Sequence, residues 1–466
     1  MESEVLTGIR ETVASLAKSP ADYADMYMQS GVSHSILFEE GRMDTLSSSQ
    51  SDGLGVRVIR GEDTAYAHTM GTTASSARRA IGEVMELSGA GRATPDAGCD
   101  EPLLEIETFI PALDAGFFHD LDRALRAECR YLRQATFHYR TSAKSVMIIR
   151  GDGSVVRDSR EYTSFSVQVV LDRDGELRTG YETRSMLSPV EGFWSGLPGD
   201  EACSAEDVAM RALRRGILML DAVPCPAGTM TVLLAGTAGG TMIHEACGHG
   251  LEADIIQKDF SVYRDRVGEV VASPLVTMVD DATMRGRYGS YRYDDEGTPA
   301  QRTVLIEDGV LKGYMSDILS ARIGGIPRTG NGRRESYMHA PLPRMSNTFI
   351  TPGTSDCDEM LGRVDNGILV KKMGGGEVNP TSGDFVFYVS EGYLVKNGVA
   401  GPAVKGATLT GNGPESLMNI AAVGRELVLD PGTCGKSGQG VPVTDGQPTL
   451  LINNLTVGGS DTGDAV

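Results

Sequence analysis

The sequence is poor in aromatic residues, with a single tryptophan among 466 residues, and it has no regular cysteine pattern. Its seven cysteines are scattered and odd in number, which argues against a disulfide framework and favours a reducing compartment. No apolar stretch approaches the roughly 20 residues that a membrane-spanning helix needs. The first residues also lack the basic start and apolar run of a signal peptide. We therefore expect a soluble cytoplasmic protein.

Basic residues are in short supply too, because 43 Lys and Arg against 63 Asp and Glu give a formal net charge of −20. This balance argues against nucleic-acid binding, which requires a basic face toward the phosphates. The glycine-rich segments GLGVRV and AGTAGG do not match the G-x-G-x-x-G pattern of Rossmann dinucleotide sites, and no acidic residue follows at the required spacing. No long-period repeat is present, so a solenoid is not expected.

The residues that are present describe a folded protein of more than one domain. Apolar residues make up 40% and charged residues 23% of the chain, which are ordinary values for a globular protein. A chain of 466 residues exceeds the size of one ordinary core, so we expect two or three domains. The 58 glycines, many of them after residue 320, predict tight turns and close backbone contacts.

Apolar periodicity near the N-terminus predicts a sheet covered by helices. Residues 2–18 and about 72–88 place apolar side chains at helical spacing. Strand-like runs lie between them, at 23–29, 33–40, 55–60 and 64–69. The segment 89–114, rich in Gly, Ala, Pro and acidic residues, is expected to be a connection and marks a candidate sub-boundary.

A third helical segment, about 115–134, precedes two predicted hairpins. Asp152 lies between two glycines and Asp174 precedes Gly175, each between apolar runs, and Asp-Gly at such a place is a strong hairpin signal. A further helix is expected at about 204–221. We place a domain boundary near residue 223, so that an N-terminal α+β region (1–222) precedes a domain of short strands, glycine turns and a few helices (223–466).

The chemistry concentrates in the segment LLAGTAGGTMIHEACGHGLEAD, where a strand and a glycine-rich turn lead to His244, Glu245 and His249. The spacing H-E-x-x-x-H is one residue longer than the zincin pattern H-E-x-x-H. In a regular helix, positions five apart differ by about 140°, so the two imidazoles would diverge. A single-turn π-bulge brings such positions together, and Gly248 makes the distortion less costly. A shared metal therefore requires a locally widened helix.

The simplest alternative is a pair of ordinary helix histidines with Glu245 exposed between them. A metal explains more, because a carboxylate beside a ligand can accept the proton of an attacking water without being a ligand itself. Catalytic zinc usually has three protein ligands, so one is missing. Glu252 and Asp254 could equally be solvated acids at a helix end. His339 lies in a Pro-rich loop, where it is equally suited to contact a substrate. The candidates for the third ligand are Glu252, Asp254, His339 and Cys434.

Cys434, in the segment DPGTCGKSGQG, is the leading candidate. Its flanking glycines let the backbone approach another element closely. The pKa of its thiol would be lowered by Lys436, and more strongly by a metal. Cys247 lies inside the histidine motif and competes for the role, although a small packed side chain is its simpler interpretation. The residues alone leave this choice open.

Three separated segments resemble the TldD/PmbA metallopeptidase family: HEACGHGLE, TGNGRRESYMHAPLPRMSNTFITPG (329–353) and PGTCGKSGQ (431–439). They occur in the family's order, and the similarity covers nearly the whole chain. The resemblance implies an α+β fold with a curved, mixed C-terminal sheet. It also implies zinc bound by His244, His249 and Cys434, with Glu245 as the motif glutamate. The retained H-E-x-x-x-H residues resemble the TldD-type catalytic subunit, since the other branch of the family lacks them and serves as its partner.

The function implied by this resemblance is zinc-dependent hydrolysis of short or unfolded peptides, by a homodimer or by a heterodimer with a homologous inactive subunit. Neither a nucleic acid nor a membrane is expected as a partner. The alternatives are a non-catalytic binding or regulatory subunit with a structural zinc, and a cysteine hydrolase that uses Cys434. The middle motif supplies polar side chains that either position substrate or brace a glycine-rich loop: Asn331, Arg333, Arg334, Tyr337 and His339.

Overall fold

The computed structural model describes residues 4–17, 22–89, 102–105, 115–197, 203–379 and 381–459. Most of the connection expected at 89–114 lies outside these residues. Within them the fold is α+β, as expected, with a long antiparallel sheet and its helices followed by a mixed β domain with short helices. In the described part of the chain, no helix combines the length and the apolar character needed to cross a membrane.

The N-terminal half is built on one six-stranded antiparallel sheet in the order β3-β2-β1-β4-β5-β6. The predicted runs 23–29 and 33–40 belong to a single strand, β1, and the run 55–60 is only the last part of β2. The serine-rich first half of β2 has no apolar alternation, which is why it escapes prediction. The strands are β1 (Asp22–Glu39), β2 (Arg42–Arg60), β3 (Asp63–Met70), β4 (Leu132–Arg150), β5 (Val155–Arg173) and β6 (Glu176–Met186).

Both predicted hairpins are confirmed. Residues 151–154 connect β4 to β5, and Asp174 with Gly175 connects β5 to β6. Asp174 and Gly175 have φ values of 57° and 88°, which are the left-handed values that a two-residue hairpin turn requires. Asp172 stabilises this turn by accepting a hydrogen bond from the Gly175 N–H at 3.0 Å. Local turn chemistry therefore sets the register of the sheet.

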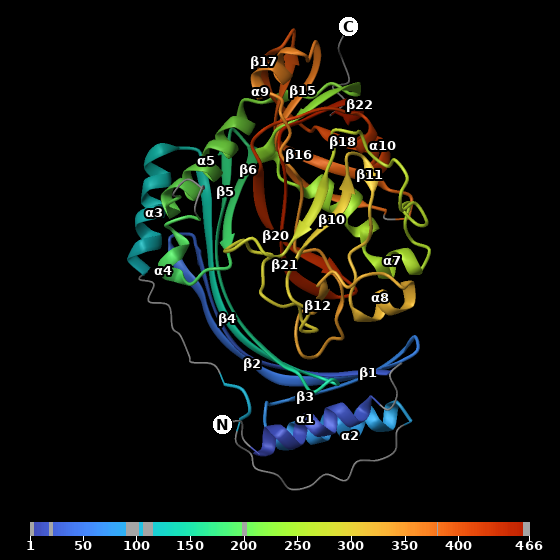
Figure 1. Ribbon diagram of the computed structural model, residues 1–466. Helices are drawn as coiled ribbons and strands as arrows, with labels where there is room; N and C mark the ends of the chain where they lie inside the picture. The colour runs from blue at the N-terminus through green and yellow to red at the C-terminus, as the bar shows by residue number, and fades with distance from the viewer. Residues whose placement is uncertain are drawn as a thin grey trace.

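Helices cover the outer face of this sheet at both ends (Figure 1). At one end, α1 and α2 bury Ile9 and Ile81 against β1 and β2. At the other end, α3 and α5 bury Phe118 and Leu213 against β4 and β5. The predicted helical stripes are thus the surfaces that pack on the sheet. The helices are α1 (Glu4–Leu16), α2 (Ala74–Leu87), α3 (Ala115–Glu128), α4 (Val190–Phe193) and α5 (Ala205–Leu220).

The C-terminal domain contains a circuit of five strands that closes on itself. β15 pairs with β8, β8 with β22, β22 with β18, β18 with β16, and β16 again with β15. Closure leaves no free edge in the circuit, and Val232, Ile368 and Phe387 are fully buried. The strands of this sheet are β7 (Val223–Pro224), β8 (Gly228–Leu234), β15 (Asn366–Val378), β16 (Asp384–Lys396), β17 (Val399–Lys405), β18 (Thr408–Asn412), β19 (Ile420–Val423) and β22 (Leu450–Gly458).

A second six-stranded sheet, in the order β11-β10-β9-β14-β21-β20, lies beside this circuit. Its edge strand β20 pairs only with β21 among the described residues, and β20 carries Cys434. Its strands are β9 (Met278–Asp281), β10 (Arg302–Glu307), β11 (Val310–Leu311), β14 (Asn347–Ile350), β20 (Val428–Lys436) and β21 (Gln439–Gln447). The smaller elements are α7 (Ala253–Gln257), α8 (Ile318–Gly324), β12 (Gly332–Arg333), β13 (Leu342–Pro343), α9 (Cys357–Gly362) and α10 (Gly413–Met418).

The C-terminal domain sits inside the curve of the N-terminal sheet (Figure 1). Arg57 on β2 is ion-paired with Asp25, and its Nη1 lies 2.7 Å from Oε1 of Glu296 in the C-terminal domain. The Tyr337 ring lies so close to β2 that a Cβ at Gly53 would be 2.3 Å from it. Glycine is therefore required at this contact. Buried ion pairs and close packing together fix the position of the two halves relative to each other.

Candidate metal centre

The H-E-x-x-x-H segment follows strand β8 after two short helical elements. These are a 3-10 turn, η1 (Gly236–Ala238), and α6 (Thr241–Ile243). The next turn, η2 (His244–Gly248), is π-helical, and η3 (His249–Leu251) follows it as a 3-10 turn. In η2 the N–H of His249 donates to the carbonyl of His244. The widened turn that the five-residue spacing demanded is therefore present.

Two glycines let this helical segment approach its neighbours. A Cβ at Gly240 would lie 2.1 Å from the backbone nitrogen of Gly446 on β21. A Cβ at Gly248 would lie 2.2 Å from Sδ of Met345. Both positions are too crowded for a larger side chain, so glycine allows the segment to lie against β21 and the loop before β14.

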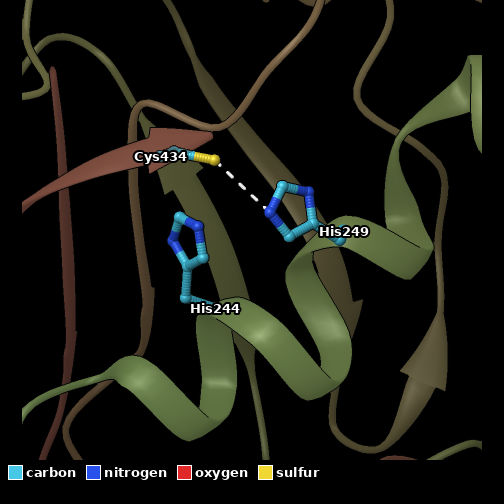
Figure 2. A group of neighbouring side chains, drawn as sticks. All are labelled: His244, His249 and Cys434. Atoms are coloured by element: carbon cyan, nitrogen blue, oxygen red, sulfur yellow. Dashed lines mark hydrogen bonds between the residues drawn. The ribbon is translucent and has the colours of Figure 1, made fainter. Parts of the chain in front are cut away.

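The histidines and Cys434 converge on one small space, as Figure 2 shows. One ligand atom from each of His244, His249 and Cys434 lies within 4.8 Å of the other two. Sγ of Cys434 is 3.3 Å from Nε2 of His249, and the two imidazole rings are nearly perpendicular, with centroids 5.1 Å apart. His244 and Cys434 are each 3% exposed. Residues 185 positions apart in the sequence thus form one donor set.

A buried carboxylate orients His249. Oε2 of Glu252 lies 2.9 Å from Nδ1 of His249, and Glu252 is fully buried. The ammonium of Lys436 lies 2.9 Å from the same oxygen and 2.6 Å from Oδ1 of Asp254. An Nδ1–H that donates to Glu252 leaves the Nε2 lone pair directed at Cys434. Glu252 is therefore a partner of a candidate ligand, and Lys436 pairs with this carboxylate rather than with the thiol.

A second carboxylate stands behind His244, at a greater distance. Oδ2 of Asp445, on β21, is 3.8 Å from Nδ1 of His244, which makes no hydrogen bond in the described residues. Oδ1 of Asp445 accepts a hydrogen bond from the N–H of Gly240 at 3.1 Å. Asp445 thereby holds the start of the helical segment and places a negative charge near the outer nitrogen of His244.

The pKa values within the donor set shift in opposite directions. Burial alone would raise the pKa of the Cys434 thiol, but hydrogen bonds from both histidines outweigh it and lower the pKa to about 5. Burial alone would lower the pKa of His249, yet Glu252 and Cys434 raise it well above its usual value. The pKa of His244 is also raised, because Cys434 outweighs burial. The thiolate is therefore the favoured form of Cys434, and the thiolate is the form that binds a metal.

Glu245 borders the same space. Its Oε2 lies 3.9 Å from Nε2 of His249, the ring nitrogen that faces Cys434. Its side chain is 33% exposed, whereas that of His249 is 13% exposed. A carboxylate at this place can contact water near the three ligand atoms without entering the donor set.

The other candidate ligands have different partners. Asp254 is ion-paired with Lys436, and Nδ1 of His339 lies 3.1 Å from the hydroxyl of Ser336. Cys247 is buried, and burial raises the pKa of its thiol to about 12. Among the described residues, the only cluster suited to hold a metal is the one formed by the two motif histidines and the late cysteine.

The middle motif, 329–353, acts as a brace around this centre. Arg333 is 2% exposed and donates to the carbonyl of Met345 at 2.6 Å, and Asn331 donates to Asp280 at 2.7 Å. Arg344, which sequence reasoning passed over, donates to the carbonyl of Cys434 at 2.6 Å. No local pattern marks Arg344 as special, because its partner lies 90 residues away. Its contact fixes the strand that presents the thiol.

Family models match three consecutive parts of the chain. The PmbA/TldA metallopeptidase domain 1 matches residues 24–88, the central domain matches residues 106–220, and the C-terminal domain matches residues 227–459. The last range contains both motif histidines, Glu245 and Cys434.

Individual relatives agree with these matches. The metalloprotease TldD homolog of Haemophilus influenzae is 38% identical over 94% of this chain and 93% of its own length. The zinc metalloprotease TldD homolog of Saccharolobus solfataricus is 30% identical over 66% of this chain and 67% of its own. The crystal structure of TldE from Thermococcus kodakarensis has a TM-score of 0.75 at 18% identity, and covers 96% of this chain and 99% of that chain. This last likeness shows a shared fold.

Proposed function

This chain belongs to the TldD/PmbA metallopeptidase family, and from that premise we propose that it is a zinc-dependent peptidase of the TldD type. In this proposal His244, His249 and Cys434 hold the metal, and Glu245 is the general base. One observation carries the proposal: the three ligand atoms lie within 4.8 Å of one another. The adjacent Glu245 carboxylate adds the group that peptide hydrolysis needs.

The donor set fits zinc. Two imidazoles and a thiolate are ligand types that zinc accepts, and three protein ligands leave a fourth position open, as in catalytic zinc sites. In the described part of the chain, no fourth His, Cys, Asp or Glu joins the group. This favours a catalytic site over a closed structural one. A bound zinc would supply Lewis acidity, lowering the pKa of water and polarising a peptide carbonyl.

Glu245 accepts and transfers the proton in this proposal. Its Oε2 would accept the proton of the attacking water and later deliver it to the leaving amine. The exposed fraction of its side chain, 33%, leaves the carboxylate accessible to water. Glu252 holds His249 through Nδ1 at 2.9 Å, so the ring keeps its orientation while the proton moves. Typical contributions of a positioned general base are about 10²–10⁴-fold in rate.

The setting favours short or unfolded peptides as substrates. Two of the ligands are 3% exposed, and the site lies in the domain that the N-terminal sheet curves around (Figure 1). The main chain of a folded protein would not reach such a place, whereas an extended peptide would. We further propose that the protein acts in the cytoplasm as a dimer, with a second copy or with a homologous inactive subunit. The likeness to TldE supports the second arrangement.

The test combines metal analysis with a peptide-library digest. We expect the wild-type chain to bind one zinc and to cleave peptides in a chelator-sensitive way. Glu245→Gln should retain zinc and lose cleavage by about 10²–10⁴-fold, whereas Cys434→Ser should lose zinc. Full activity of Glu245→Gln would remove the base assignment, and unchanged zinc content in Cys434→Ser would remove that ligand.

Two further outcomes separate the alternatives. Tight zinc binding by a wild-type chain that cleaves no peptide would favour a non-catalytic binding or regulatory subunit. Cleavage that survives chelation would favour a cysteine hydrolase based on Cys434.

A further inference from the structure

A cleft of about 340 Å³ separates the inner face of the N-terminal sheet from the β20–β21 hairpin. Its floor is formed by β1, β2, β4 and β5, and its roof includes Thr433, Gly440 and Pro442 of the hairpin. The volume falls at the lower end of the about 300–1,000 Å³ that is typical of small-ligand sites. No residue of the proposed metal centre lines this cleft.

The register of the sheet creates the space. Gly31 on β1 lies opposite Lys144 on β4 and Ser51 on β2. In the next row, Ser33 lies opposite Ser142 and Ser49. Small side chains at these facing positions leave a hollow, because residues two apart on a strand share a face. The long side chain of Lys144 projects from the same face and lines the hollow.

Two cations line this cleft without a partner. The side chains of Lys144 and Arg140 make no hydrogen bond or ion pair to another described residue, and both line the cleft. The one carboxylate on the lining, Glu335, already accepts a hydrogen bond from the N–H of Gly440 at 2.6 Å. The cleft lining therefore carries two cationic side chains against one carboxylate, in a protein whose formal net charge is −20.

The surroundings reinforce the positive field. Burial lowers the pKa of Lys144 to about 8, and the guanidinium groups of Arg160, Arg333 and Arg334 act in the same direction. Asp295 opposes them, but it is ion-paired with Arg160 at 2.9 Å. An anion that enters the cleft would meet a partly buried cation that has no ion-pair partner of its own.

We propose that this cleft binds a carboxylate of the peptide substrate, with Lys144 as its anchor and Arg140 at the rim. The inference rests on the proposed peptidase function, which supplies a peptide as the ligand. Thr433 lines the cleft, and the next residue, Cys434, points to the opposite face of the same strand. Thr433 and Cys434 are consecutive residues of β20, so the cleft and the metal centre border opposite faces of one strand, and the separation is within the span of a short extended peptide. The carboxylate belongs either to the C-terminus or to an Asp or Glu side chain of the peptide.

Binding to the zinc-loaded Glu245→Gln protein tests this assignment without cleavage. The probes are three synthetic versions of one acidic decapeptide: unmodified, amidated at the C-terminus, and with its acidic side chains changed to amides. We expect at least one neutralised version to bind about tenfold or more weakly than the unmodified peptide. The version that loses affinity identifies the source of the carboxylate.

Variants in the same background assign the effect to the cleft. Lys144→Met should bind all three peptides with similar, weak affinity, whereas Lys144→Arg should keep the preference. Lys396→Met, which removes an exposed lysine on β16, is the matched control and should change nothing. Equal unfolding midpoints verify that the variants are folded.

The inference is overturned if the three peptides bind equally, if none binds, or if Lys144→Met keeps the preference. These results are independent of the peptidase proposal. Cleavage without any carboxylate preference would leave the peptidase standing and remove the cleft site. A Lys144-dependent preference in a protein that never cleaves would support the cleft site and remove the peptidase proposal.

Discussion

Two buried polar clusters in this chain differ in how their charges are balanced. In the interdomain cluster, the guanidinium group of Arg57 lies between the carboxylates of Asp25 and Glu296, and all three side chains are at most 2% exposed. In the metal centre, two imidazoles and the thiol of Cys434 face one another, and each offers a lone pair. The first cluster pairs opposite charges, whereas the second gathers three groups that can each donate a lone pair to one metal ion.

This difference separates a structural role from a functional one. The interdomain cluster finds its counter-charge within the chain, so a substitution that breaks the cluster should lower the free energy of unfolding. The proposed metal centre takes its cation from outside the chain, so changes there should lower metal affinity. Unfolding of the metal-free protein and zinc titration of the folded protein therefore report on different clusters.

The largest effect should follow from breaking the interdomain cluster. Arg57→Met leaves the buried carboxylate of Asp25 without its cation and the buried carboxyl group of Glu296 without its donor, and losing one partner of a buried pair costs about 3–5 kcal/mol. We expect a lower midpoint of urea unfolding in the metal-free protein. Arg126→Met is the control, since Arg126 is 41% exposed in its pair with Asp122 and should cost at most about 1 kcal/mol. Similar effects of the two substitutions would contradict a special role for the interdomain cluster.

The next effect concerns metal affinity. Glu252→Gln removes the charge that holds Nδ1 of His249 while it keeps the size of the side chain. We expect zinc affinity to fall about 10–100-fold, or about 1.4–2.7 kcal/mol, as measured by competition with a chromophoric chelator. Glu269→Gln, at an exposed ion pair with Arg266, should leave zinc affinity unchanged. A zinc affinity of Glu252→Gln equal to that of the wild type would show that the contact does not orient the ligand.

The pH dependence of stability sharpens the comparison further. Burial raises the pKa of Glu296 from 4.5 to about 8, against the opposing effect of Arg57 and with the help of Asp317 and Asp294. The folded state then binds a proton that the unfolded state has lost, so its stability falls as pH rises from about 4.5 through about 8. Between pH 6 and pH 8 we expect a loss of about 2 kcal/mol.

The measurement compares unfolding midpoints of metal-free wild type and Glu296→Gln at pH 6 and pH 8. The variant carries no titrating group at this position, so its midpoint should change less between the two pH values. An identical pH dependence in the two proteins would mean that Glu296 is already ionised at pH 6.

The smallest effect is expected at the second carboxylate of the metal centre. Asp445 lies 3.8 Å from Nδ1 of His244, which is longer than a hydrogen bond. Asp445→Asn should therefore lower zinc affinity less than tenfold, or by less than about 1.4 kcal/mol, in the same chelator competition. A larger loss than that of Glu252→Gln would reverse the ranking of the two carboxylates.

The sequence predicts local features of this molecule better than pairings between distant segments. The Asp174-Gly175 turn and the helical stripe around Ile81 are local signals, and the structure contains both elements as predicted. The first half of β2 was missed because its serines carry no apolar alternation. Strand pairing with β1 alone makes these residues a strand. Local chemistry thus predicts turns and amphipathic faces, and tertiary pairing decides the rest.

The candidate site divides in the same way. The five-residue spacing of His244 and His249 predicted a π-helical turn, and the structure has one. The contacts of Glu252 with His249, of Lys436 with Glu252, and of Arg344 with the strand of Cys434 could not be predicted. Each joins groups whose partnership depends on how separate elements pack.

The sequence by itself determined the α+β class, the hairpin turns and the widened helical turn, because these depend on residues that are close along the chain. Only the tertiary structure decided which cysteine meets the histidines, which carboxylates stand behind them and which cations remain unpaired. Hydrogen bonds and ion pairs act over a few ångströms in space, and the fold brings Cys434 to His249 across 185 positions of sequence.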